Sequence, residues 1–423
     1  MVSSATQAAH ADLLARRDLT LDLARVACVL LVVVIHLLMV GVGVAPDGTM
    51  VASMPLEAQS WFPAATWVGQ IMPLFFVVGG FAAATGWRSA QRKGLAAGDY
   101  VRSRALRLSQ PALPLFVFFA IVLGAVAVLG VAPELVACAA RGAGTPLWFL
   151  AAYLLCQAVV PLMSRLHERA PVQTMLVLLG AVVLVDVVRF AGGVPAVGWL
   201  NLFFVWVLIQ QIGFWYADGW FDRRSPWTLV AIAVVAYVAL VPLTMWGPYP
   251  VDMLANLNPP TVCLVVLGVA QAALLRLLKP LLTALMRVRV MQGIVLVAGS
   301  RLMTIYLWHL PVLLAVTGLT LLIPGAAPEP ASAAWWWSRP IVLVLALALI
   351  YLLTLAIARW EGIGVLGARP SVWLIGLAVI CAFAPPFAVT VWALDAWIAA
   401  WGAVLLAVAV VLLRRPWVRA AAS

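Results

Sequence analysis

Ionisable side chains near the start of the sequence lie in or beside a long apolar run, where such groups are costly and therefore indicate function. They are Asp22, Arg25 and His36. In a helix, the step from Arg25 to His36 turns through about 1100°, about 20° past three full turns, so both share one face about 16.5 Å apart. Asp22 lies one turn before Arg25, as an ion-pair partner would. One ligand can therefore contact Arg25 and His36. The structural alternative is a histidine hydrogen-bonded to a neighbouring helix and an arginine at the membrane edge.

Two further pairs have helical spacing. Arg104 and Arg107 point the same way on a helix, and two guanidinium groups at the mouth of a bundle suit phosphates. The alternative is that they only set topology, as part of the basic loop expected after the second apolar run. Tyr306 and His309 share a face at i, i+3, either as secondary site candidates or as a structural hydrogen-bonded pair. The five cysteines show no CxxC spacing, so we expect neither a disulfide framework nor a metal site. We also expect no tightly bound cofactor.

The elements that must position these residues are apolar. Of 423 residues, 65% are hydrophobic and 10% charged, which excludes a soluble globular enzyme. Apolar runs of about twenty residues, the length of a membrane-spanning helix, recur along the chain. We therefore predict an all-α polytopic membrane protein with about ten core spans and about two C-terminal spans. The expected spans are 23–44, 61–87, 111–132, 146–163, 174–191, 197–217, 227–246, 261–278, 301–323, 341–358, 372–394 and 397–413.

The distribution of basic residues predicts the orientation. The net charge is +11, but the basic residues fall in alternate loops, which is typical of membrane topology rather than of a nucleic-acid-binding face. With the N-terminus in the cytoplasm, 23 of the 26 are cytoplasmic, and only Arg141, Arg189 and Arg339 are outside. Both termini are then cytoplasmic. The excess of arginine, 24 against two lysines, suits a high-GC bacterium and hence a plasma membrane that faces a cell envelope.

Together these motifs resemble the acyltransferase-3 family of integral membrane acyltransferases, over residues 19–358. The matching segments are Asp22-x-x-Arg25 followed after ten residues by His36, Phe75-Phe76-x-x-Gly79-Gly80-Phe81, Arg104-x-x-Arg107, and Tyr306-x-x-His309-x-Pro311. The chain departs from the family pattern at three positions. Leu23 and Val26 stand where family members commonly have glycine, and Gly79 stands where they commonly have serine. A role for a hydroxyl on residue 79 is therefore not expected.

The resemblance implies a bundle in the lipid bilayer that passes an acyl group, often acetyl, from cytoplasmic acyl-CoA to a hydroxyl of a sugar, glycolipid or similar acceptor. It implies that His36 is catalytic, that Arg25 is the matching family arginine, and that Arg104 and Arg107 lie near the coenzyme. His36 would act as a general base or carry the acyl group, and either role needs a neutral imidazole. We expect a cytoplasmic polar tail over 1–20, an acyltransferase-like domain over 21–358, and additional spans with a short basic tail over 359–423.

Other functions suit parts of the sequence. About twelve spans with a buried histidine also describe a proton-coupled secondary transporter. Such carriers usually show paired repeats with interrupted helices, and the sequence shows no internal repeat. A glycosyltransferase that uses a lipid-linked donor is less consistent, because Asp47 and Glu57 of the first outer loop do not form a tight acidic pair. A structural scaffold would not need Arg25, His36 and the arginine pair in this order.

Overall fold

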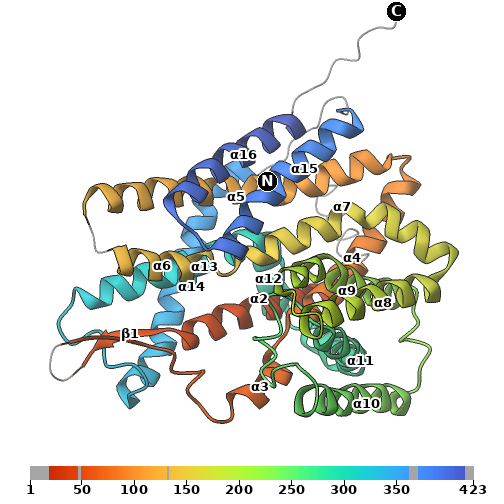
Figure 1. Ribbon diagram of the computed structural model, residues 1–423, viewed down its shortest axis with the longest axis horizontal. Helices are drawn as coiled ribbons and strands as arrows, with labels where there is room; N and C mark the ends of the chain where they lie inside the picture. The colour runs from red at the N-terminus through yellow and green to blue at the C-terminus, as the bar shows by residue number, and fades with distance from the viewer. Residues whose placement is uncertain (1–18, 46–48, 131–132, 362–369, 415–423) are drawn as a thin grey trace, which may run out of the picture.

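The computed structural model describes residues 19–45, 49–130, 133–361 and 370–414 as a bundle of helices (Figure 1). Within these ranges twelve helical segments are long and apolar enough to cross a membrane. This confirms the predicted all-α polytopic fold. The tail predicted over 1–20 lies outside the described residues except for its last two, and so do Asp47 and the basic residues Arg369, Arg415 and Arg419.

Apolar runs of membrane-spanning length account for the long helices. The elements are α2 (Leu19–Met39), β1 (Gly41–Val44), β2 (Met50–Ser53), α3 (Phe62–Gly69), α4 (Met72–Arg92), α5 (Ala97–Val128), α6 (Pro133–Gly144), α7 (Leu147–Arg169), α8 (Pro171–Phe190), the 3-10 helix η1 (Pro195–Leu200), α9 (Asn201–Ala217), α10 (Pro226–Met245), α11 (Val262–Leu285), α12 (Arg289–Ser300), α13 (Leu302–Leu321), α14 (Ala333–Glu361), α15 (Val372–Trp392) and α16 (Ala396–Arg414). The short helices α3 and α6 each lead into the long helix that follows, within one apolar segment.

Two of the differences from the predicted boundaries affect the candidate site. Helix α5 begins at Ala97 rather than at 111, so Arg104 and Arg107 lie on the helix itself and not in a loop. A run of strong helix formers precedes its apolar part, and hydropathy does not detect that extension. Helix α2 ends at Met39 rather than at 44, because Gly41–Val44 pairs with Met50–Ser53 as an antiparallel hairpin. The hairpin lies beyond His36, and the Val44 amide donates to the Ala327 carbonyl at 3.0 Å.

Close backbone contact between α4 and α9 depends on two glycines. A Cβ at Gly80 would overlap the Gln210 carbonyl, and a Cβ at Gly213 would overlap the Val77 carbonyl. Only glycine allows helices to approach this closely. Gly80, the second of the adjacent glycines of α4, therefore serves helix packing.

The last two helices are part of the same bundle. Helix α16 packs along α5, and α15 packs along α7 (Figure 1). Arg102 of α5 is 2% exposed, and its Nε donates to the Leu413 carbonyl at the end of α16, at 2.7 Å. The residues predicted as additional spans thus support the helix that carries Arg104 and Arg107.

Candidate functional site

A cavity of about 520 Å³ lies among the N-terminal halves of α2, α5 and α13, at the end of the bundle where α2 begins. Four arginines line it: Arg25, Arg104, Arg107 and Arg301. No acidic side chain is among its described lining residues. The structure thus brings the two predicted arginine motifs together and adds Arg301. So many guanidinium groups on one cavity wall favour a ligand with several negative charges.

Neighbouring residues hold these arginines in place. Arg25 Nη1 lies 3.8 Å from Asp22 Oδ1, so the expected ion pair within α2 is present. The Nε of Arg25 is buried and has no hydrogen-bond partner among the described residues. The Arg104 guanidinium lies 5.0 Å from the centre of the Tyr100 ring, and Arg301 Nη1 donates to the Thr354 carbonyl at 2.8 Å. The guanidinium groups are therefore oriented before any ligand binds.

Helix α7 contributes a second wall. Phe149, Tyr153 and Gln157 line the cavity and follow one another at intervals of four residues, which places them on one helix face. Gln157 is 3% exposed, and its Nε2 has no hydrogen-bond partner among the described residues. A buried amide donor without a partner is costly. Gln157 can thus donate a hydrogen bond to a ligand carbonyl. The sequence does not reveal this role, because a single polar residue within a span is common.

His36 lies beyond the deep end of this cavity and does not line it. Arg25, Val29, Val32 and His36 follow one another at intervals of four, three and four residues in the continuous helix α2, so they form one stripe. Val29 borders the cavity, and Val32 borders a small apolar extension of it. His36 is one further turn along the stripe, about 6 Å beyond Val32 along the helix axis. The predicted common face of Arg25 and His36 is therefore the face of α2 that borders the cavity. His36 lies on the same face, one turn beyond the cavity.

The partner of His36 is His309 of α13. Nδ1 of His36 lies 3.1 Å from Nε2 of His309, and Nδ1 of His309 lies 2.5 Å from the Tyr306 carbonyl oxygen. His309 is fully buried. The Tyr306 hydroxyl does not contact His309 but donates to the Pro146 carbonyl at 2.9 Å. Tyr306 and His309, which the sequence suggests as a pair, are thus linked through the backbone carbonyl of Tyr306. The hydrogen bond between two side chains joins His309 to His36 instead.

This hydrogen-bond chain indicates which nitrogen of His36 carries the proton. A carbonyl oxygen only accepts, so Nδ1 of His309 carries the proton and donates to Tyr306. In the neutral ring Nε2 of His309 then accepts, and Nδ1 of His36 must donate to it. The remaining nitrogen of His36, Nε2, therefore has a free lone pair. A histidine oriented in this way can act as a base or a nucleophile.

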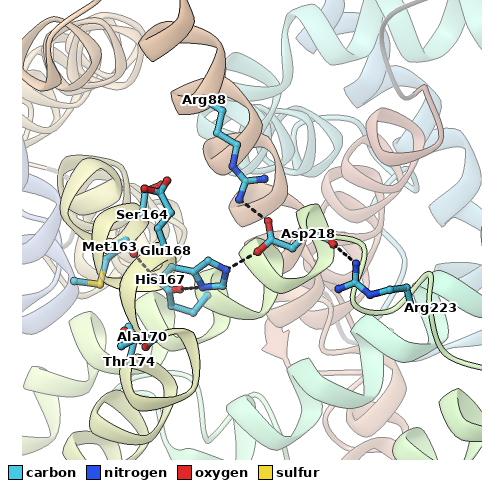
Figure 2. Close-up of polar contacts among 10 residues, drawn as sticks. Arg88, Met163, Ser164, His167, Glu168, Ala170, Thr174, Asp218 and Arg223 are labelled. Carbon is cyan, nitrogen blue, oxygen red and sulfur yellow. Dashed lines mark hydrogen bonds and ion pairs between the residues drawn. The ribbon is translucent and has the colours of Figure 1, made fainter.

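A second buried histidine has a different arrangement (Figure 2). Nδ1 of His167 lies 3.0 Å from Gln211 Oε1, and its Nε2 lies 2.9 Å from Asp218 Oδ2. Asp218 also pairs with Arg88 at 2.5 Å (Figure 2). Although partial burial disfavours the carboxylate, hydrogen bonds from His167 and Arg88 hold the pKa of Asp218 below its usual range. Both ring nitrogens of His167 face oxygen atoms of neighbouring side chains, so this cluster connects α4, α7 and α9. His167 does not line the arginine cavity.

Comparison with known proteins agrees with this geometry. The acyltransferase domain of the acyltransferase-3 family matches residues 18–359, close to the range of 19–358 predicted from the motifs. No curated protein and no solved structure matches the chain. The matched region contains α2, α5 and α13, which carry the arginines and the histidine pair. The match covers most of the chain, and the protein therefore belongs to the acyltransferase-3 family of membrane acyltransferases.

Proposed function

We propose that this acyltransferase takes an acyl group from acyl-CoA bound in the arginine-lined cavity and transfers it to a hydroxyl of a sugar, glycolipid or similar envelope acceptor. The observation that carries the proposal is the stripe of α2, which has Arg25 in the cavity and the free Nε2 of His36 beyond its deep end. Phosphates of the coenzyme bind the arginines. The extended arm then directs the thioester toward His36.

The reaction uses His36 as the base. Nε2 of His36 accepts the proton of the acceptor hydroxyl while the hydroxyl oxygen attacks the thioester carbonyl carbon. The new C–O bond forms and the C–S bond breaks. The proton then passes from His36 to the departing sulfur, so coenzyme A leaves as the free thiol. His309 accepts a hydrogen bond from Nδ1 of His36 throughout, which stabilises the positive charge that develops on the ring.

The arginine-lined end of the bundle faces the cytoplasm in this proposal. The cavity arginines lie in or beside the N-terminal parts of α2, α5 and α13, the first, third and ninth candidate spans. Five further arginines lie in the C-terminal parts of α4, α7 and α11, which belong to the second, fourth and eighth spans: Arg88, Arg92, Arg165, Arg169 and Arg276. Because successive spans cross in opposite directions, all of these ends lie on one side. An excess of basic residues marks the cytoplasmic side of membrane proteins. Both termini are then cytoplasmic, the membrane is the plasma membrane, and the cavity opens to the compartment that supplies acyl-CoA.

The test is binding and turnover of radiolabelled acetyl-CoA by the purified protein in lipid nanodiscs. We expect the wild type to bind it and to release coenzyme A slowly. His36→Ala should bind with unchanged affinity while turnover falls at least about 100-fold, the order of a general base. Arg104→Ala should weaken binding about 10-fold, as the loss of a charge-assisted hydrogen bond does.

Arg289→Ala is the matched control, because this exposed arginine does not line the cavity. It should behave as the wild type. Retained turnover in His36→Ala would refute the site assignment. If the wild type does not bind acyl-CoA, the acyltransferase mechanism fails, and a proton-coupled transporter with His36 as its proton site becomes the leading function.

A further inference from the structure

The cavity continues into a narrow apolar extension, which we call the neck. Its free volume is about 10 Å³. Helix α2 contributes three of its lining residues, α4 two, and α7 and α13 one each: Cys28, Val29, Val32, Met72, Phe75, Phe149 and Tyr306. Val29, Phe75, Phe149 and Tyr306 also line the large cavity. The neck is thus the part of the cavity that points along α2 toward His36.

Packing holds the walls of the neck in place. The Phe75 and Phe149 rings meet edge to face at 5.0 Å, and Phe149 lies 4.6 Å from the Tyr306 ring. All three rings are buried. The hydrogen bond from the Tyr306 hydroxyl to the Pro146 carbonyl fixes the third ring and removes its polar atom from the neck. A longer chain can enter only if these rings move, and overpacking a rigid apolar site is unfavourable.

The neck and the large cavity suit different parts of the donor. Amide groups of the coenzyme arm need hydrogen-bond partners, because burying them unpaired is costly. The large cavity offers such groups in Gln157, Ser300 and Thr304. The neck has an apolar surface, so only the acyl group belongs there. A volume of about 10 Å³ holds about one water-sized or methyl-sized group.

We propose that the neck formed around Phe75, Phe149 and Tyr306 selects the acyl group by length and restricts the donor to acetyl-CoA and its shortest homologues. This inference rests on the proposed function, since it assigns the acyl group of a coenzyme A thioester to the neck. The arginine-lined cavity binds the coenzyme equally well whatever the length of the acyl chain. Discrimination arises where the chain must fit between the rings and α2.

The test is equilibrium binding of coenzyme A and its S-ethyl, S-butyl and S-octyl thioethers to the protein in nanodiscs, with empty nanodiscs correcting for partition of the octyl chain into lipid. These thioethers need no acceptor and do not react. We expect S-octyl coenzyme A to bind the wild type at least about 10-fold more weakly than S-ethyl coenzyme A. Val32→Ala and Phe75→Ala, which enlarge the neck, should reduce this ratio at least about threefold.

Matched controls separate this effect from general loosening of the bundle. Val33→Ala and Phe119→Ala truncate buried side chains that do not line the neck, and both should keep the wild-type ratio. Length selection is refuted if the wild type binds the S-ethyl and S-octyl compounds equally well, or if the ratio of these two affinities is unchanged in both enlarged variants. Either result leaves the proposed function standing. If coenzyme A and all three thioethers fail to bind, the proposed function fails together with the selection that depends on it.

Discussion

Replacing His309 by leucine tests the tautomer assignment of His36. The substitution introduces an apolar side chain of similar length and removes the acceptor for Nδ1–H of His36, which lies 3.1 Å away. Loss of the acceptor for a partly buried donor costs up to about 1–3 kcal/mol. Moving the proton to Nε2 avoids that cost and removes the lone pair that accepts the hydroxyl proton in the proposed mechanism. The active tautomer should therefore lose about 5- to 150-fold in population, and turnover should fall by a similar factor.

The assay is steady-state turnover of acetyl-CoA in nanodiscs, with kcat and KM measured separately. His309 does not line the cavity, so the KM for acetyl-CoA should stay within about twofold while kcat falls. His309→Gln restores an acceptor oxygen and should recover most of kcat. An equal loss in the leucine and glutamine variants, or a loss confined to KM, would refute the assignment of the reactive nitrogen.

Three other changes give measurable outcomes. Gln157→Leu removes the unpartnered amide donor of the cavity and should weaken coenzyme A binding about 3- to 10-fold in the same binding assay, with no loss of thermal stability. Arg102→Leu breaks the bond to the Leu413 carbonyl and should lower stability by about 1–3 kcal/mol, detected as a lower thermal unfolding midpoint and faster proteolysis of the C-terminal helices. Asp218→Asn should lower the unfolding midpoint at pH 7. The folded-state pKa of Asp218 is depressed, so its stabilising effect is present above about pH 4 and is lost as the pH falls further, where the wild type and this variant should converge.

Hydropathy is sufficient to predict the fold class because a membrane helix must satisfy its own backbone groups and present apolar side chains to lipid. It does not detect where a helix continues beyond the apolar layer. The N-terminal turns of α5 show this limit, because Arg102, Arg104 and Arg107 are polar in sequence yet helical in the structure. The β1–β2 hairpin was missed for a related reason, since alternating glycine and valine at 41–44 is as apolar as the span before it.

The candidate site was predictable where its residues are close in sequence. Helical spacing alone predicts that Asp22 pairs with Arg25 and that Arg104 and Arg107 point the same way. The bond between His36 and His309 joins residues 273 positions apart, and only the packing of α13 against α2 creates it. Arg301 and Gln157 could not be recognised either. In the sequence Arg301 is explained as a charge at the start of a span, and Gln157 as a polar residue within a span.

The departure at Gly79 shows why a missing residue type does not mean a missing group. Family members commonly carry serine there, and the sequence suggested that any hydroxyl role was lost. In the structure a Cβ on residue 79 would lie 3.2 Å from the Tyr153 ring and 3.5 Å from its hydroxyl oxygen. Glycine therefore makes room for Tyr153, which lines the arginine cavity. A hydroxyl therefore lies beside position 79 even without serine, because Tyr153 of α7 supplies it in place of a side chain of α4.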